Sequence, residues 1–315
     1  MTPREIVSAT IKFRGPERLA RSFPGEYGND FAGCSMNPNP DGRPGKGVDE
    51  WGAVWENIGV CHLGEVKEFP LREWADLDRI RIPDVSEPRR WAHLEGIRER
   101  SGDRYLLCNG ISLYERVHFL RGLENTWADI YTDPTNLRRL IGILVDMNLH
   151  AVERYGRLGC DGFIFCDDWG LQDRLMISPA TWREFWKPAY AMVYRAARAA
   201  GLHTLLHTCG YTLDILPDLI EIGLDVIQLD QQENMGLERL AAYAGQITFW
   251  CPVDIQTVMC HGSEADIRAY CQALVRQLGT ARGGFLPKWY GDPVGAGHTQ
   301  AAVDAMCSEF LRLGP

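Results

Sequence analysis

Two residues of types that can bind soft divalent metals are separated by a single residue in the segment His207-Thr208-Cys209-Gly210. The segment directly follows an apolar run at residues 202–206, which predicts a short strand. Because side chains two positions apart on an extended chain point the same way, the imidazole and the thiol should leave the strand end together. Both are ligands that zinc prefers, so this segment predicts half of a zinc site. The plainer alternative is a buried histidine beside a small core cysteine.

Two later strand-like segments also end in a residue that can bind zinc. Asp230 follows the apolar residues 226–229, and Cys251 follows residues 247–250. We therefore take Asp230 and Cys251 as further candidate ligands. A packed core thiol is the alternative for Cys251, and a helix cap or an ion pair is the alternative for Asp230. Glu233 is close enough to Asp230 in the sequence to compete for the same role.

A sheet must position these residues, and most of the chain alternates short apolar strands with longer amphipathic helices. Asp133-Pro134 and Ser178-Pro179 are typical of an N-cap and a first helical position, and they predict helices that run to about residues 155 and 200. The repeated alternation favours an α/β fold, a (β/α)8 TIM-type barrel in a single domain over residues 1–315. Barrel enzymes carry their chemistry at the carboxyl ends of the strands. We expect strands at about residues 18–23, 105–108, 162–166, 202–206, 225–229, 247–250 and 283–286.

Residues 31–98 fit this alternation poorly. Their first part is rich in Gly, Pro and Asp, and Trp51, Trp55 and Trp74 follow. We interpret the region as a long N-terminal insertion that folds over the barrel mouth, with a hairpin at about residues 55–69, rather than as an independent domain.

The composition excludes several classes of function. The 315 residues are 45% hydrophobic and 24% charged, which is typical of a globular enzyme with one large core. A net charge of -9 disfavours nucleic acid or an anionic membrane surface as a partner. The ten cysteines lack the spacing of a disulfide scaffold, and no apolar stretch reaches about twenty residues. We therefore expect a cytoplasmic protein with reduced thiols, and the composition leaves a homo-oligomer open.

Four segments together carry a family resemblance. They are Asp167-Asp168-Trp169-Gly170 with the nearby Met176-Ile177-Ser178-Pro179, the His207 to Gly210 motif, residues 217–225, and residues 249–256 with Val253-Asp254-Ile255-Gln256. Through them nearly the whole chain resembles the uroporphyrinogen decarboxylase superfamily, which also contains corrinoid-dependent methyltransferases. The resemblance implies a barrel enzyme, but it does not choose the reaction.

Charge argues against the decarboxylase branch. That branch has an arginine-rich motif soon after its first strand, which suits a substrate with many carboxylates. The corresponding loop here, residues 24–30, contains the acids Glu26 and Asp30. Acids at this point would repel such a polyanion. The methyltransferase branch is therefore favoured, with decarboxylation of a tetrapyrrole and a non-catalytic ligand-binding barrel as alternatives.

The methyltransferase branch resembles a zinc enzyme whose metal is held by an H-x-C pair and a later cysteine. His207 and Cys209 match the pair, but the strand that should carry the later cysteine, at residues 285–290, has no thiol. Cys251 is our substitute. The resemblance implies that the methyl group of a small methylated substrate, most naturally a methoxylated aromatic, passes to a corrinoid (cobalamin) on a partner protein. Zinc would polarise the departing oxygen or sulfur.

The remaining candidate residues follow predicted strand ends. Asp167 and Asp168 form a carboxylate pair in which one member, with its pKa raised by the other, could protonate the departing oxygen; capping of the next turn is the alternative. Acids and aromatic rings around the mouth would suit a small aromatic ether or a cation. The substrate-binding candidates are Glu26, Tyr27, Asn29, Asp30, Asn109, Trp169, Trp250, Trp289 and Tyr290.

Overall fold

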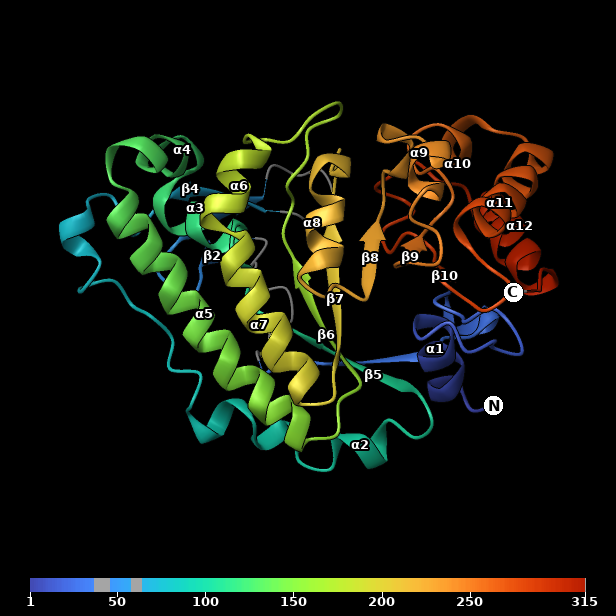
Figure 1. The fold of residues 1–315 in the computed structure, drawn as a ribbon, viewed down its shortest axis with the longest axis horizontal. Coiled ribbons are helices and arrows are strands. Elements are labelled where there is room, and N and C mark those ends of the chain that lie inside the picture. Colours follow the sequence, from blue (N-terminus) through green and yellow to red (C-terminus); the bar gives the residue numbers. More distant parts are fainter. Residues whose placement is uncertain (37–45, 58–63, 315) are drawn as a thin grey trace.

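The computed structural model describes residues 1–36, 46–57 and 64–314 and contains a curled parallel sheet surrounded by helices (Figure 1). Phe31 on the first strand stacks on Trp250 of the sixth at 4.9 Å between ring centroids, so the sheet curls far enough to bring its two sides together. This arrangement confirms the predicted α/β TIM-like fold. In spatial order the seven described strands are β1 (Phe31–Cys34), β5 (Tyr105–Asn109), β6 (Gly162–Cys166), β7 (His203–Thr208), β8 (Val226–Leu229), β9 (Thr248–Cys251) and β10 (Phe285–Pro287).

The first strand of the sheet is not where the sequence predicted it. Residues 18–23 were expected as a strand, but β1 begins at Phe31, inside the region interpreted as an insertion. The earlier segment runs between β10 and β1 and makes only scattered backbone bonds, such as the amide of Trp289 to the carbonyl of Ser22 at 3.0 Å. Its buried Leu19, Ala20 and Phe23 give it the apolar character of a strand without a regular ladder.

Two layers of apolar side chains alternate along the strands. Ile164, Leu205 and Val226 point to the inside of the curled sheet and pack with Trp250 and Leu286. Their neighbours in sequence point outward against the helices, as Phe163, Leu206, Ile227, Phe249 and Phe285 do. This two-residue period decides which side chains at a strand end face the interior.

The helices cover the outside of the sheet, with α5 and α7 side by side on one flank and α11 and α12 on the other (Figure 1). Asp133 caps α5 by accepting from the amide of Asn136, and Ser178 caps α6 in the same way, as the sequence predicted. The second predicted helix breaks at Trp186 into two. The helices are α1 (Pro3–Ile11), α2 (Ile97–Arg100), α3 (Glu115–Arg121), α4 (Leu123–Thr132), α5 (Pro134–Arg157), α6 (Pro179–Phe185), α7 (Lys187–Ala199), α8 (Leu216–Glu221), α9 (Leu237–Ala241), α10 (Val258–His261), α11 (Glu264–Leu278) and α12 (Gln300–Arg312).

The insertion forms a small antiparallel sheet of β2 (Gly47–Val48), β3 (Val54–Asn57) and β4 (Gly64–Glu68). The pairing of β3 with β4 confirms the predicted hairpin; residues 37–45 and 58–63 of the region lie outside the described residues. Arg116 of α3 holds this sheet through a buried ion pair with Asp49 at 3.0 Å. Because α3 follows β5, the insertion is anchored at the carboxyl end of the sheet. Its role as a cover for the mouth stays a prediction.

No helix within the described residues combines the length and the apolar character that crossing a membrane requires.

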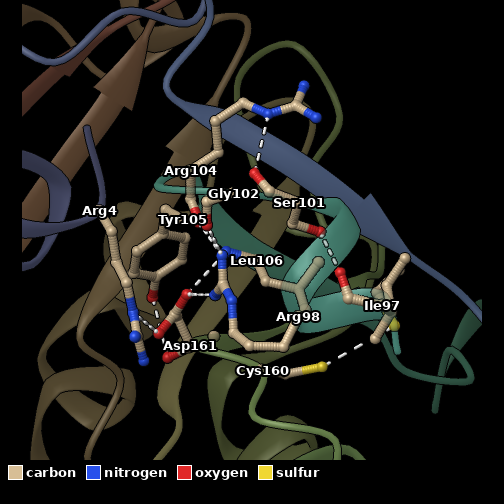
Figure 2. Close-up of polar contacts among 12 residues, drawn as sticks. Arg4, Ile97, Arg98, Ser101, Gly102, Arg104, Tyr105, Leu106, Cys160 and Asp161 are labelled. Carbon is tan, nitrogen blue, oxygen red and sulfur yellow. Dashed lines mark hydrogen bonds and ion pairs between the residues drawn. The ribbon is translucent and has the colours of Figure 1, made fainter. Parts of the chain in front are cut away.

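Asp161 ties several elements together at the opposite, amino end of the sheet. Figure 2 shows Arg4 of α1 and Arg98 of α2 converging on its carboxylate, at 2.6 and 2.8 Å. The same carboxylate accepts the amide of Leu106 on β5 at 2.8 Å, and the backbone carbonyl accepts the amide of His203 on β7. Asp161 therefore joins two helices and two strands next to the start of β6.

Replacement of Asp161 by Ala should lower the free energy of unfolding by about 1–3 kcal/mol, because the buried amide of Leu106 loses its acceptor. Urea unfolding measures the change. Asp173→Ala is the matched control, since Asp173 is exposed and its ion pair is with the equally exposed Arg174; it should change stability by less than about 0.5 kcal/mol. Equal effects of the two substitutions would contradict the role given to Asp161.

Candidate metal centre

His207 and Cys209 meet at the carboxyl end of β7. His207 lies in register with Cys166 of β6 and Gln228 of β8, in the layer that faces the interior. Cys209 follows the strand by one residue and keeps its alternation, so its side chain points the same way. Its Sγ lies 3.5 Å from Nε2 of His207. The sequence-predicted pair is therefore brought together, half-buried, at the mouth of the sheet.

Asp168 is the third member of this cluster. Its Oδ1 lies 3.6 Å from Nε2 of His207 and accepts the amide of Cys209 at 2.9 Å. One ligand atom from each of Asp168, His207 and Cys209 lies within 4.8 Å of the other two. The sequence predicted Asp168 as an acid catalyst. The structure places it instead among three side chains that can share a metal ion.

Close contact between two loops brings Asp168 to the other two residues. Gly170, after β6, and Gly210, after β7, touch backbone to backbone. A Cβ on Gly170 would lie 2.2 Å from the amide nitrogen of Tyr211, and one on Gly210 would lie 2.3 Å from the carbonyl oxygen of Gly170. Gly210 also has φ +73°, which favours glycine. Backbone bonds from Gly170 to Cys209 at 3.2 Å and from Tyr211 to Leu171 at 2.7 Å hold the loops together.

The electrostatics of the cluster suit a cation. Burial raises the pKa of the Cys209 thiol, and the carboxylates of Asp168 and Asp230 raise it further. An imidazole nitrogen, a thiol and a carboxylate thus converge in a region of negative potential. A divalent cation between them would stabilise the thiolate and remove the repulsion. Three protein ligands of types N, S and O, with one position left for substrate, are the arrangement of a catalytic zinc site.

Comparisons with known proteins identify the family. The family model described as uroporphyrinogen decarboxylase (URO-D) matches residues 65–286, which is more than half of the chain and includes the cluster. The chain belongs to the uroporphyrinogen decarboxylase family. A relative named uroporphyrinogen decarboxylase, from Nocardia farcinica, is 26% identical over 188 residues, a match that spans 56% of this chain and only 50% of that protein.

A solved structure supports the fold of this family member. A methyltransferase from Methanosarcina mazei superposes with a TM-score of 0.69, covering 98% of each chain, at 16% sequence identity. At this identity the likeness establishes the fold alone. It leaves open which reaction of the family the chain performs.

Cys251, predicted as a ligand, does not join the cluster. It is fully buried on the outer face of β9 and packs with the residues beneath the helices. Its neighbour Trp250 takes the inward position, in register with Gln228. The strand period makes Cys251 point away from His207, so its assignment as a ligand was wrong. Burial raises the pKa of its thiol, and the carboxylates of Glu233 and Asp230 raise it further.

Asp230, the fourth predicted ligand, lies behind Gln228, which in turn contacts His207. Its Oδ1 accepts Nε2 of Gln228 at 2.8 Å and Nζ of Lys288 at 2.8 Å. It is not a member of the three-residue cluster. Burial alone would raise the pKa of Asp230, but the positive charge of Lys288 and the hydrogen bonds from Lys288 and Gln228, among other contributions, together outweigh burial, and the pKa lies below its usual value. The alternative of an ion-pair partner therefore describes this residue.

Asp167 cannot reach substrate in this structure. It is fully buried, and its carboxylate accepts the amides of Leu113, Tyr114 and Glu115, each at 2.9 Å. It also accepts the hydroxyl of Tyr190 at 2.6 Å. Burial raises its pKa to about 6, against the effect of these donors, and Asp168 is not the cause. The predicted acid instead accepts the amides at the start of α3, which precedes it in the chain, and not those of the following turn that the alternative named.

The loop before β1 also lies away from the cluster. The carbonyl of Asp30 accepts the amide of Tyr105, the first residue of β5, so the loop meets the amino ends of the strands. Asp30 itself is buried in an ion pair with Arg18. Tyr27 donates to Asp304 of α12 at 2.7 Å, which raises the pKa of Tyr27 to about 12. These residues precede the first strand instead of following it, so the reason for expecting Glu26, Tyr27, Asn29 and Asp30 to bind substrate was wrong.

Two predicted substrate-binding tryptophans belong to the core. Trp169 is fully buried, stacks on Tyr114 at 4.0 Å and donates to Tyr190. Trp250 is enclosed inside the sheet against Phe31. Both were predicted at the mouth because the sequence does not distinguish an aromatic residue near a strand end that lines the rim from one that fills the core. For Asn109, Trp289 and Tyr290, binding of substrate stays a prediction.

Glu233 is a further acid near the carboxyl end of β8, and one of its oxygens has no partner among the described residues. It lies on a single turn that follows β8, and its buried Oε1 has no hydrogen-bond partner. Burial raises the pKa of Glu233 to about 8. At neutral pH this side chain is therefore mostly a neutral acid that can donate a proton.

Gly170→Ala should lower the free energy of unfolding by about 1–3 kcal/mol, because the new Cβ meets the backbone of Tyr211 and forces the two loops apart. Gly142→Ala, in α5 with open space around the new Cβ, is the matched control and should be neutral or stabilising by up to about 1 kcal/mol. Urea unfolding compares the two. A Gly170→Ala protein as stable as wild type would show that the loops are not in this contact.

Proposed function

We propose that this protein is a zinc-dependent methyltransferase that moves a methyl group from a small methylated compound, with a methoxylated aromatic as the favoured class, to a corrinoid on a partner protein. The observation that carries the proposal is the convergence of Asp168, His207 and Cys209 at the carboxyl ends of β6 and β7. We assign Asp168 as the third ligand, in place of the late cysteine that this chain lacks. Zinc bound there would act as a Lewis acid on the oxygen or sulfur that gives up the methyl group.

The protein's own residues supply the rest of the chemistry. The contact between the loops at Gly170 and Gly210 would hold the three ligands in place before substrate binds, which lowers the entropy cost of organising the site. An oxygen that loses a methyl group also needs a proton, and Asp167 is too deeply buried to provide it. Glu233 is the better candidate for the proton donor, since it is a buried, mostly neutral acid on the turn that follows β8, the strand next to β7. We assign it that role in this proposal.

The decarboxylase alternative is supported by the name of the family and of the Nocardia relative. The argument against it from Glu26 and Asp30 has to be withdrawn, because Asp30 is paired with Arg18 and both acids precede the first strand instead of following it. The argument that replaces it is the carboxylate of Asp168 at the strand ends, which disfavours a polycarboxylate substrate; Asp230 is neutralised by Lys288, and Glu233 is mostly uncharged at neutral pH. A barrel that only binds a ligand is the remaining alternative.

Metal analysis of purified variants tests the ligand set. Wild type should carry one zinc per chain, Cys209→Ala and Asp168→Ala should lose most of it, and Cys251→Ala should keep it. Cys251→Ala is the matched control, because it removes a thiol from the outer face of the next strand but one. Wild-type protein without stoichiometric zinc would favour the binding barrel, and zinc loss in Cys251→Ala would return that residue to the ligands.

Methyl transfer tests the reaction itself. We expect methoxylated phenols to convert reduced cobalamin to methylcobalamin, followed by the change in cobalt absorbance. Asp168→Ala should lower the rate by at least about a hundredfold through loss of the metal, and Glu233→Gln by about 10²–10⁴-fold through loss of the proton donor. Consumption of uroporphyrinogen with no methylcobalamin formed would show that the decarboxylase alternative is correct.

A further inference from the structure

A chain of hydrogen bonds that is buried at its centre leads away from Nδ1 of His207. Nδ1 of His207 contacts Oε1 of Gln228, the residue beside it in the sheet. Nε2 of Gln228 donates to Oδ1 of Asp230 at 2.8 Å, and the same oxygen accepts from Nζ of Lys288 at 2.8 Å. Gln228 and Asp230 are each 5% exposed. The chain thus crosses from β7 through β8 to the end of β10 with little access to water.

The two ends of this chain decide which way the amide of Gln228 points. An ionised carboxylate can only accept hydrogen bonds, and Lys288 keeps Asp230 ionised. The NH₂ group of Gln228 must therefore face Asp230, and its carbonyl oxygen must face His207. A carbonyl oxygen accepts but does not donate, so Nδ1 of His207 has to carry a proton. In the neutral imidazole the lone pair is then on Nε2, the atom that faces Asp168 and Cys209.

We propose that Gln228 is a positioning residue that holds His207 in its Nδ1–H tautomer, and that Asp230 and Lys288 fix the direction of the amide. The lone pair of Nε2 is thereby aimed at the cluster before any ion binds. The consequence for a metal rests on the proposed function, but the tautomer is a property of the protein alone. Partners of this kind behind a ligating histidine typically change metal affinity by about 10–100-fold.

The tautomer is measured on metal-free protein by the ¹⁵N shifts of the His207 ring, at about pH 8.5, well above the usual histidine pKa of about 6.5. Wild type should show Nδ1 protonated and Nε2 bare. Gln228→Met, which keeps the volume but removes the amide, should lose this preference, and Gln228→Glu, whose carboxylate also accepts from Nδ1, should retain it. Asp230→Asn offers a second route, because it frees the amide to turn and should weaken the preference. Gln246→Leu, at an exposed site before β9, is the control and should leave the spectrum unchanged.

Zinc affinity, measured by competition with a chelator, gives the second readout. Gln228→Met should raise the dissociation constant about 10–100-fold, and Gln246→Leu should not change it. A wild-type ring with Nε2 protonated, or an Nδ1–H tautomer that persists in both Gln228→Met and Asp230→Asn, would overturn the proposal. If the tautomer behaves as expected but neither wild type nor any variant binds zinc, the positioning role of Gln228 stands and the proposed function fails. If Gln228→Met does not fold, the wild-type and Asp230→Asn spectra still decide the proposal.

Discussion

The candidate site depends on one backbone contact, the approach of the loops after β6 and β7 at Gly170 and Gly210. Neither glycine leaves room for a side chain, and the backbone bonds between the loops follow from that closeness. The contact turns two separate short motifs into a single cluster, because it brings Asp168 within reach of His207 and Cys209. Without it the chain would present an imidazole and a thiol with no third ligand, since the later cysteine of the methyltransferase branch is missing.

A second constraint is the two-residue period of the strands, which decides which of the neighbouring polar side chains face the inside of the sheet. His207, Gln228 and Trp250 share one inward-facing layer, so Gln228 comes to lie against the imidazole and Cys251 is turned to the helices. Asp230 also faces inward, but Lys288 and Gln228 occupy its carboxylate. The site is therefore built outward from three candidate ligands through an amide to a buried ion pair. Such an arrangement fixes the direction of the ligands as well as their identity.

Membership of the uroporphyrinogen decarboxylase family fixes the scaffold and leaves the chemistry to the residues at the strand ends. In this chain those residues are a mixed set of nitrogen, sulfur and oxygen donors with further acids nearby. Replacing a thiolate by a carboxylate makes a bound zinc ion a harder Lewis acid, which suits activation of an oxygen leaving group. This balance of ligands is the physical reason to prefer a methyl ether over a thioether within the proposed function.

The sequence alone was sufficient for the α/β barrel-like fold, the caps of α5 and α6, the hairpin of the insertion and the pairing of His207 with Cys209. All of these depend on local periodicity, capping residues or a spacing of two. The tertiary structure alone decided that Asp168 is in the cluster, that Asp167 caps α3, that the loop at residues 24–30 precedes the first strand instead of following it, and that Trp169 and Trp250 are core. These outcomes depend on which loops touch and where the first strand begins. The position of Gln228 beside His207 and the outward direction of Cys251 needed both kinds of information. The alternation of side chains along a strand is in the sequence, but the register that aligns His207 with Gln228 and Trp250 comes only from the structure.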